Sequence, residues 1–124
     1  MHKFKYFLPA LVWAILIFSL STSSAVTKIE FNLLSADKIG HLVFYAVQVV
    51  LLIWAFLKLR RLIYLPLGIL SLCWSLSFVY GVSLELVQAM LPYRSFDYAD
   101  MIANGVGALL GALIYRFCLK VSYC

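Results

Sequence analysis

The stretch that decides the fold is LVFYAVQVVLLIWAFL, which occupies residues 42–57. Gln48 is its one strongly polar residue, and a basic cluster at residues 58–61 follows it directly. Together with the residues just before it, the run is long enough to cross the hydrocarbon core of a bilayer at about 1.5 Å per residue. The sequence therefore predicts a transmembrane helix over residues 39–57.

The composition of the whole chain is that of a membrane protein. Of the 124 residues, 65% are hydrophobic and 12% are charged, whereas about 25% are charged in soluble domains. Mean hydropathy is +1.02. Because a soluble chain of this length could not bury so much apolar surface, lipid is the expected solvent. The length leaves room for one domain and none for a separate soluble catalytic domain.

Three further apolar segments bring the predicted number of spans to four. The helices are expected at residues 6–26, 39–57, 66–91 and 98–119. The predicted fold class is all-α, an integral membrane four-helix bundle with short loops, and residues 1–124 are expected to form a single transmembrane domain. The first segment has a rival interpretation, because its basic start and the small residues Ser23, Ser24 and Ala25 are also typical of a cleavable signal peptide.

The charge distribution predicts the orientation of the bundle. With four spans, seven basic residues fall on one side, namely Lys3, Lys5, Lys58, Arg60, Arg61, Arg116 and Lys120. Three basic residues and all five acidic residues belong to the other half. Because basic loops are retained in the cytoplasm, both termini are predicted to be cytoplasmic. The net charge of +5 then reflects topology and attraction to anionic lipid, and no nucleic-acid partner is expected.

Two patterns concern the packing of the helices. Gly107 and Gly111 have the small-residue spacing that lets two helix backbones approach closely, which predicts a packed helix more than a dimer. Residues 36–41 and 99–104 are similar to each other at an offset of about half the chain. Two helical hairpins in parallel repeat would produce this similarity, although coincidence would also explain it.

Polar residues break the apolar pattern at three places, which the predicted topology brings to one side of the membrane. Spacings of three and four residues put each set on one helical face. The sets are Asp37 with His41, Glu85 with Gln88, and Asp97 with Asp100 and Asn104. Glu85 is expected roughly 9 Å below the end of its helix, where an unpaired carboxylate costs a few kcal/mol. Its available partners are Arg94, Lys38 and His41.

A structural interpretation competes for some of these residues. Asp97 is a possible N-cap, Asp100 would be favoured in a first helical turn by the helix dipole, and Asp37 could play the same part for the second helix. His41 alone could be an interior histidine with satisfied hydrogen bonds. Glu85 lies where no cap is needed and so points more strongly to a functional site.

The same residues resemble those of the VanZ-like membrane proteins, which are named after a protein associated with teicoplanin resistance. The resemblance covers about residues 37–115. It rests on the motifs Asp37-Lys38-x-x-His41, Glu85-x-x-Gln88 and Pro92-x-Arg94-x-x-Asp97-x-x-Asp100-x-x-x-Asn104-x-x-Gly107. It implies a small helical bundle of the bacterial cytoplasmic membrane with a link to the cell envelope and glycopeptide antibiotics, and it supplies no mechanism. Tyr93 departs from the family pattern, in which many relatives have glycine.

The first functional hypothesis is a non-enzymatic envelope protein that binds through its outer polar residues. The expected partners are membrane lipids, and further an envelope lipid intermediate or a membrane protein; no cofactor or metal is expected. Arg94 would hold a phosphate or carboxylate through its planar guanidinium. The predicted binding residues are Asp37, Lys38, His41, Glu85, Gln88, Arg94, Asp97, Asp100 and Asn104.

The alternative is an intramembrane enzyme that acts on a lipid-linked substrate, with Glu85 or Asp100 as general base and His41 as acid. In a variant of this hypothesis, these three residues and Asp37 hold a divalent cation. The absence of hydrolase motifs such as HExxH and GxSxG argues against catalysis. A small transporter or accessory subunit is a third possibility, but Gln48 alone does not provide a polar path through the second span.

Overall fold

The computed structural model describes residues 2–22, 34–92 and 98–122, with side chains for 2–22, 39–92 and 98–118. Its elements are the 3-10 helix η1 (His2–Phe7) and the α-helices α1 (Leu8–Thr22), α3 (Leu34–Arg60), α4 (Leu67–Ala89) and α5 (Tyr98–Ser122). Four helical spans are long and apolar enough to cross a membrane, η1 and α1 together forming the first. The predicted all-α, four-helix membrane fold is confirmed.

The helix boundaries differ from the expected ranges mainly in the first half of the chain. α3 begins at Leu34, five residues before the expected start, so Asp37 lies inside the helix and is not its N-cap. α1 ends at Thr22, and residues 23–26 of the expected first span lie outside the described residues. The change from 3-10 to α-helix falls next to Pro9, which has no N–H for an α-helical hydrogen bond to Lys5.

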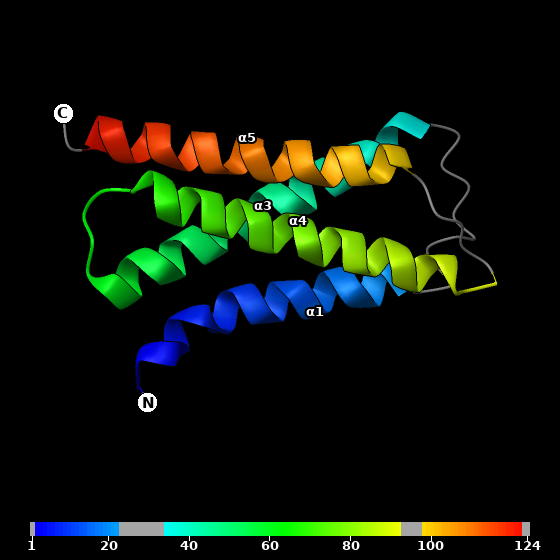
Figure 1. Cartoon of the computed structure of the whole chain (residues 1–124), viewed down its shortest axis with the longest axis horizontal. Coiled ribbons are helices and arrows are strands. Elements are labelled where there is room, and N and C mark those ends of the chain that lie inside the picture. The colour runs from blue at the N-terminus through cyan, green and yellow to red at the C-terminus, as the bar shows by residue number, and fades with distance from the viewer. Residues whose placement is uncertain (1, 23–33, 93–97, 123–124) are drawn as a thin grey trace.

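The four helices run alternately up and down, so α1 begins and α5 ends at the same end of the bundle (Figure 1). α3 and α5 are therefore parallel to each other, as are α1 and α4. Hydrogen bonds join residues at similar depth in each parallel pair, with sequence separations of 63, 66 and 67 for His41 to Asn104, Ala14 to Tyr80 and Ser21 to Gln88. This is the geometry that two helical hairpins in parallel repeat would have.

Glycines let α3 and α5 lie almost backbone to backbone. A Cβ atom on Gly111 would be 2.5 Å from the carbonyl oxygen of Ala46, and one on Gly107 would overlap the carbonyl oxygen of Leu42. The small-residue spacing noted in the sequence is therefore used within the chain, between two of its own helices.

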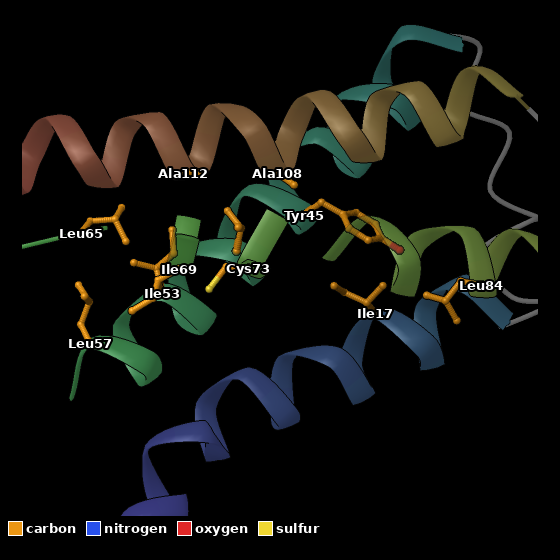
Figure 2. Packing of buried hydrophobic residues seen from close by; sticks show 11 residues of the cluster. Ile17, Tyr45, Ile53, Leu57, Leu65, Ile69, Cys73, Leu84, Ala108 and Ala112 are labelled. Carbon is orange, nitrogen blue, oxygen red and sulfur yellow. The ribbon is translucent and has the colours of Figure 1, made fainter. Parts of the chain in front are cut away.

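Apolar side chains fill the centre of the bundle between these helices. Tyr45, Ile53, Ile69, Cys73 and Ala108 belong to one buried cluster (Figure 2). Large apolar side chains on the outward faces of all four spans are exposed, as expected for surfaces that meet lipid.

α1 is joined to the rest of the bundle by specific contacts. Ile17 is buried in the common core. The indole N–H of Trp13 donates a hydrogen bond to the carbonyl of Phe44 at 2.9 Å, and the hydroxyl of Tyr80 donates one to the carbonyl of Ala14. These contacts make α1 part of the same helical bundle as α3 and α4.

Candidate functional site

Polar side chains from three helices meet near the end of the bundle at which α3 and α5 begin and α4 ends. We call His41, Glu85, Asp100 and Asn104 the polar cluster. Glu85 and Asn104 are each 1% exposed and Asp100 is 8% exposed. Asp100 lies in the first turn of α5, and Asn104 follows one turn later on the same face. Ionisable groups buried this deeply are uncommon in a membrane bundle and are usually functional.

His41 lies between the two polar residues of α5. Its Nδ1 atom is 2.8 Å from Oδ1 of Asn104, and its Nε2 atom is 3.7 Å from Oδ2 of Asp100. Because an amide oxygen only accepts hydrogen bonds, Nδ1 carries the proton. Nε2 then offers a lone pair when the ring is neutral and forms an ion pair with Asp100 when the ring is protonated.

The carboxylate of Glu85 completes a group of three potential metal ligands. One ligand atom from each of His41, Glu85 and Asp100 lies within 4.8 Å of the others. One imidazole nitrogen and two carboxylate oxygens suit several divalent transition metals. The hydrogen bond from Nδ1 to Asn104 resembles the contact that usually orients a metal-binding histidine. The same arrangement suits proton exchange between the imidazole and a carboxylate.

The position of Asn104 depends on Gly81 of α4, which belongs to none of the polar sequence motifs. A Cβ atom at Gly81 would be 2.9 Å from Nδ2 of Asn104 and 3.0 Å from the ring of Tyr45. Among the described residues, Nδ2 of Asn104 has no hydrogen-bond partner, although it is buried. Such a donor costs about 1–3 kcal/mol unless something accepts its hydrogen bond. An isolated glycine inside an apolar helix was the available sequence signal for this close approach.

The other predicted site residues are not among the four that form the polar cluster. The amide nitrogen of Gln88 donates a hydrogen bond at 2.9 Å to the carbonyl of Ser21, in the last turn of α1. Carbonyls there have no partner within their own helix, so this hydrogen bond from Gln88 caps the end of α1. Asp37 and Lys38 lie in the first turns of α3, but only their backbone is described. Arg94 and Asp97 lie outside the described residues.

The chain matches the model of a known protein family. The family model described as VanZ/LLP1 matches residues 6–119. The match extends beyond the motifs at residues 37–115 and includes all of α1. Comparisons with curated proteins and with solved structures give no match.

Proposed function

The chain belongs to the VanZ/LLP1 family, and from this premise we propose that its polar cluster binds the head group of an envelope lipid in the bacterial cytoplasmic membrane. The observation that carries the proposal is the graded exposure of the cluster. His41 is partly exposed and Asp100 is 8% exposed, whereas Glu85 is 1% exposed. A ligand entering from the membrane surface meets His41 and Asp100 first.

The chemistry of the polar cluster indicates what kind of head group it would take. Carboxylates accept hydrogen bonds from hydroxyl, amide and ammonium groups, and the free donor of Asn104 would bind an acceptor. Envelope lipid intermediates that carry sugars and peptides present both kinds of group. Arg94, which precedes α5 by four residues in the sequence, would add a partner for phosphate.

The proposed orientation puts both termini in the cytoplasm and the polar cluster at the outer leaflet. Basic residues gather at the other end of the bundle, in η1, at the end of α3 and near the end of α5. This distribution supports the orientation, because positively charged segments are retained on the cytoplasmic side. An outer site would be accessible to envelope precursors and to glycopeptides, which is consistent with a contribution to teicoplanin-type resistance.

The test is Glu85→Gln, which removes the carboxylate charge and keeps the size of the side chain. Native mass spectrometry of the protein extracted from its host membrane would measure the co-purifying lipid. We expect lipid retention to fall about tenfold or more, as for the loss of a charge-assisted hydrogen bond. The melting temperature in detergent should stay unchanged, and survival in teicoplanin should fall.

The matched control is Glu30→Gln, which makes the same chemical change at a carboxylate that is not among the predicted binding residues. It should leave lipid retention and survival unchanged. If Glu85→Gln lowers survival in teicoplanin only as much as it lowers the amount of folded protein, Glu85 holds helices together and does not bind a ligand. If a protein co-purifies in place of a lipid, the polar cluster binds a membrane protein partner and not a lipid head group.

A second function is favoured by one specific observation, the convergence of three metal-ligating atoms from His41, Glu85 and Asp100. A divalent cation held there would polarise a phosphate or carbonyl oxygen of a lipid-linked substrate. Without a metal, the same residues would exchange protons with a substrate. An acid–base or metal-dependent membrane enzyme is therefore the alternative to a binding protein.

A further inference from the structure

A second candidate site lies at the opposite end of the bundle from the polar cluster. A cleft of about 420 Å³ is formed there by η1, the end of α3, the segment that follows it and α5. This volume falls within the range of small-molecule sites, about 300–1,000 Å³. The side chains that carry the argument are Tyr6, Trp54, Lys58, Arg61, Ile63 and Tyr115.

Arg61 has an unusual backbone conformation at this cleft. Its φ is 54°, and it is the one non-glycine residue with positive φ in the part of the chain that the structure describes. The N–H of Arg61 donates to the carbonyl of Lys58 at 3.2 Å, and the N–H of Leu62 donates to that of Leu57 at 2.9 Å. These two bonds form the Schellman motif, in which glycine usually occupies the left-handed position because a Cβ is unfavourable there.

Arg61 is not required as a positive charge at the C-terminal end of α3. Positive charge near a helix C-terminus is favourable, but Lys58 and Arg60 already supply it from inside the last turn. The left-handed conformation at residue 61 adds a cost that glycine would avoid. A strained residue that lines a cleft suggests that its side chain is used there.

The walls of the cleft combine positive charge with aromatic rings. Lys58 and Arg61 are the charged residues among the described lining, and no described lining residue is acidic. Tyr6 packs edge to face with Trp54 at 5.9 Å between ring centroids, and Nζ of Lys5 lies 5.6 Å from the Tyr6 ring. Ile63 is 67% exposed beside them. Tyrosine and tryptophan are typical of the membrane–water interface, where phospholipid head groups lie.

We propose that this cleft binds the phosphate group of an anionic phospholipid. Arg61 would hold two phosphate oxygens through its guanidinium, Lys58 would add charge, and Ile63 would contact the first part of an acyl chain. Basic pockets between transmembrane helices are suited to such head groups. The site shares no residue with the polar cluster and does not depend on the function proposed for that cluster.

The decisive variant is Arg61→Gly, because its effects on binding and on stability have opposite signs. Glycine removes the guanidinium and also relieves the left-handed strain. We expect binding of phosphatidylglycerol, counted by native mass spectrometry in neutral detergent, to weaken about fivefold to tenfold. The variant should melt at the same temperature as the unmodified protein or higher, so loss of binding could not be attributed to unfolding.

Arg60→Gln is the matched control, since it removes one positive charge from the adjacent residue, which does not line the cleft. It should retain phosphatidylglycerol, and Glu85→Gln should retain it too. Phosphatidylcholine should bind more weakly than phosphatidylglycerol to the unmodified protein. Competition by inorganic phosphate would assign the site to soluble phosphates, and failure to compete would assign it to the lipid.

Three results would overturn the proposal. The first is unchanged phosphatidylglycerol binding by Arg61→Gly. The second is an equal loss in Arg60→Gln, which would mean that net charge alone attracts the lipid. The third is equal binding of phosphatidylcholine, because a cationic cleft should discriminate in favour of the anionic head group.

Discussion

At the scale of single residues, His41 has the most informative surroundings. Each ring nitrogen faces a different side chain of α5, Asn104 at 2.8 Å and Asp100 at 3.7 Å. Because Nδ1 donates its hydrogen bond to Asn104, the Nε2 lone pair of the neutral ring is left on the side of Asp100. That arrangement distinguishes a potential ligand from a histidine that merely fills a gap between helices.

A metal titration tests this reading of His41. If the enzyme alternative is correct, Zn²⁺ or Mn²⁺ should raise the melting temperature of the purified protein, with about 2.7 kcal/mol of stabilisation at a hundredfold excess over Kd. His41→Gln and Glu85→Gln should each remove most of the shift, because each deletes one of three ligands.

His2→Gln is the control for that titration, because His2 is an exposed histidine in η1 at the other end of the bundle. It should behave like the unmodified protein. A shift that persists without His41, or no shift with either metal, would exclude the metal-dependent form of the enzyme alternative.

At the scale of helices, the α3–α5 interface decides whether the polar cluster can form. It is built on small residues of α5, and the hydrogen bond between His41 and Asn104 spans the same interface one turn before Gly107. A change in the separation of these helices would therefore alter both the stability of the bundle and the geometry of the cluster.

Adding a methyl group to the α3–α5 interface tests how strongly the stability of the bundle depends on the close approach of these two helices. Gly107→Ala and Gly111→Ala would bring a Cβ against backbone atoms of Leu42 and Ala46, which cannot rotate away. We expect each to destabilise the protein by about 1–3 kcal/mol, as overpacked cores do. The melting temperature in detergent measures the change.

Gly68→Ala is the matched control, because nothing lies within 4 Å of a Cβ at that position in the first turn of α4. It should leave stability unchanged or raise it by up to about 1 kcal/mol through helix propensity. Equal melting temperatures for all three alanine variants would contradict the close packing of α3 on α5.

At the scale of the whole molecule, charge is separated between the two ends of the bundle. The polar cluster contains the buried acids Glu85 and Asp100, whereas Lys58 and Arg61 lie at the cleft on the other end. If the positive end faces the cytoplasm, the two proposed sites serve opposite leaflets.

Cysteine labelling in intact cells tests that orientation. On a background without native cysteines, single cysteines would replace Ser35 near the start of α3 and Ser122 at the end of α5. A membrane-impermeant reagent should label the first and miss the second. The reverse labelling pattern would show that the orientation is opposite to the proposed one and that the polar cluster lies on the cytoplasmic side.

The sequence by itself determined the membrane fold and the helical faces of the polar residues. Backbone groups in lipid must be satisfied within a helix, so the lengths of the apolar runs predict the spans without knowledge of their packing. The 3.6-residue period likewise put Asp100 and Asn104 on one face. α3 spans Leu34–Arg60 and so extends beyond the predicted range 39–57 at both ends. The length of the apolar run does not limit a helix, because its backbone hydrogen bonds can continue outside the hydrocarbon.

Only the tertiary structure decided which polar groups meet. Helical period gives the face of a residue but not the rotation of one helix against another. For this reason the pairing of His41 with Asn104 and the capping of α1 by Gln88 were not predictable, and the isolated Gly81 signalled a close approach without identifying Asn104 as the residue that it meets. The cleft at Arg61 depends further on how the chain leaves α3 in a left-handed turn beside η1 and α5, which neither apolar runs nor charge counts encode.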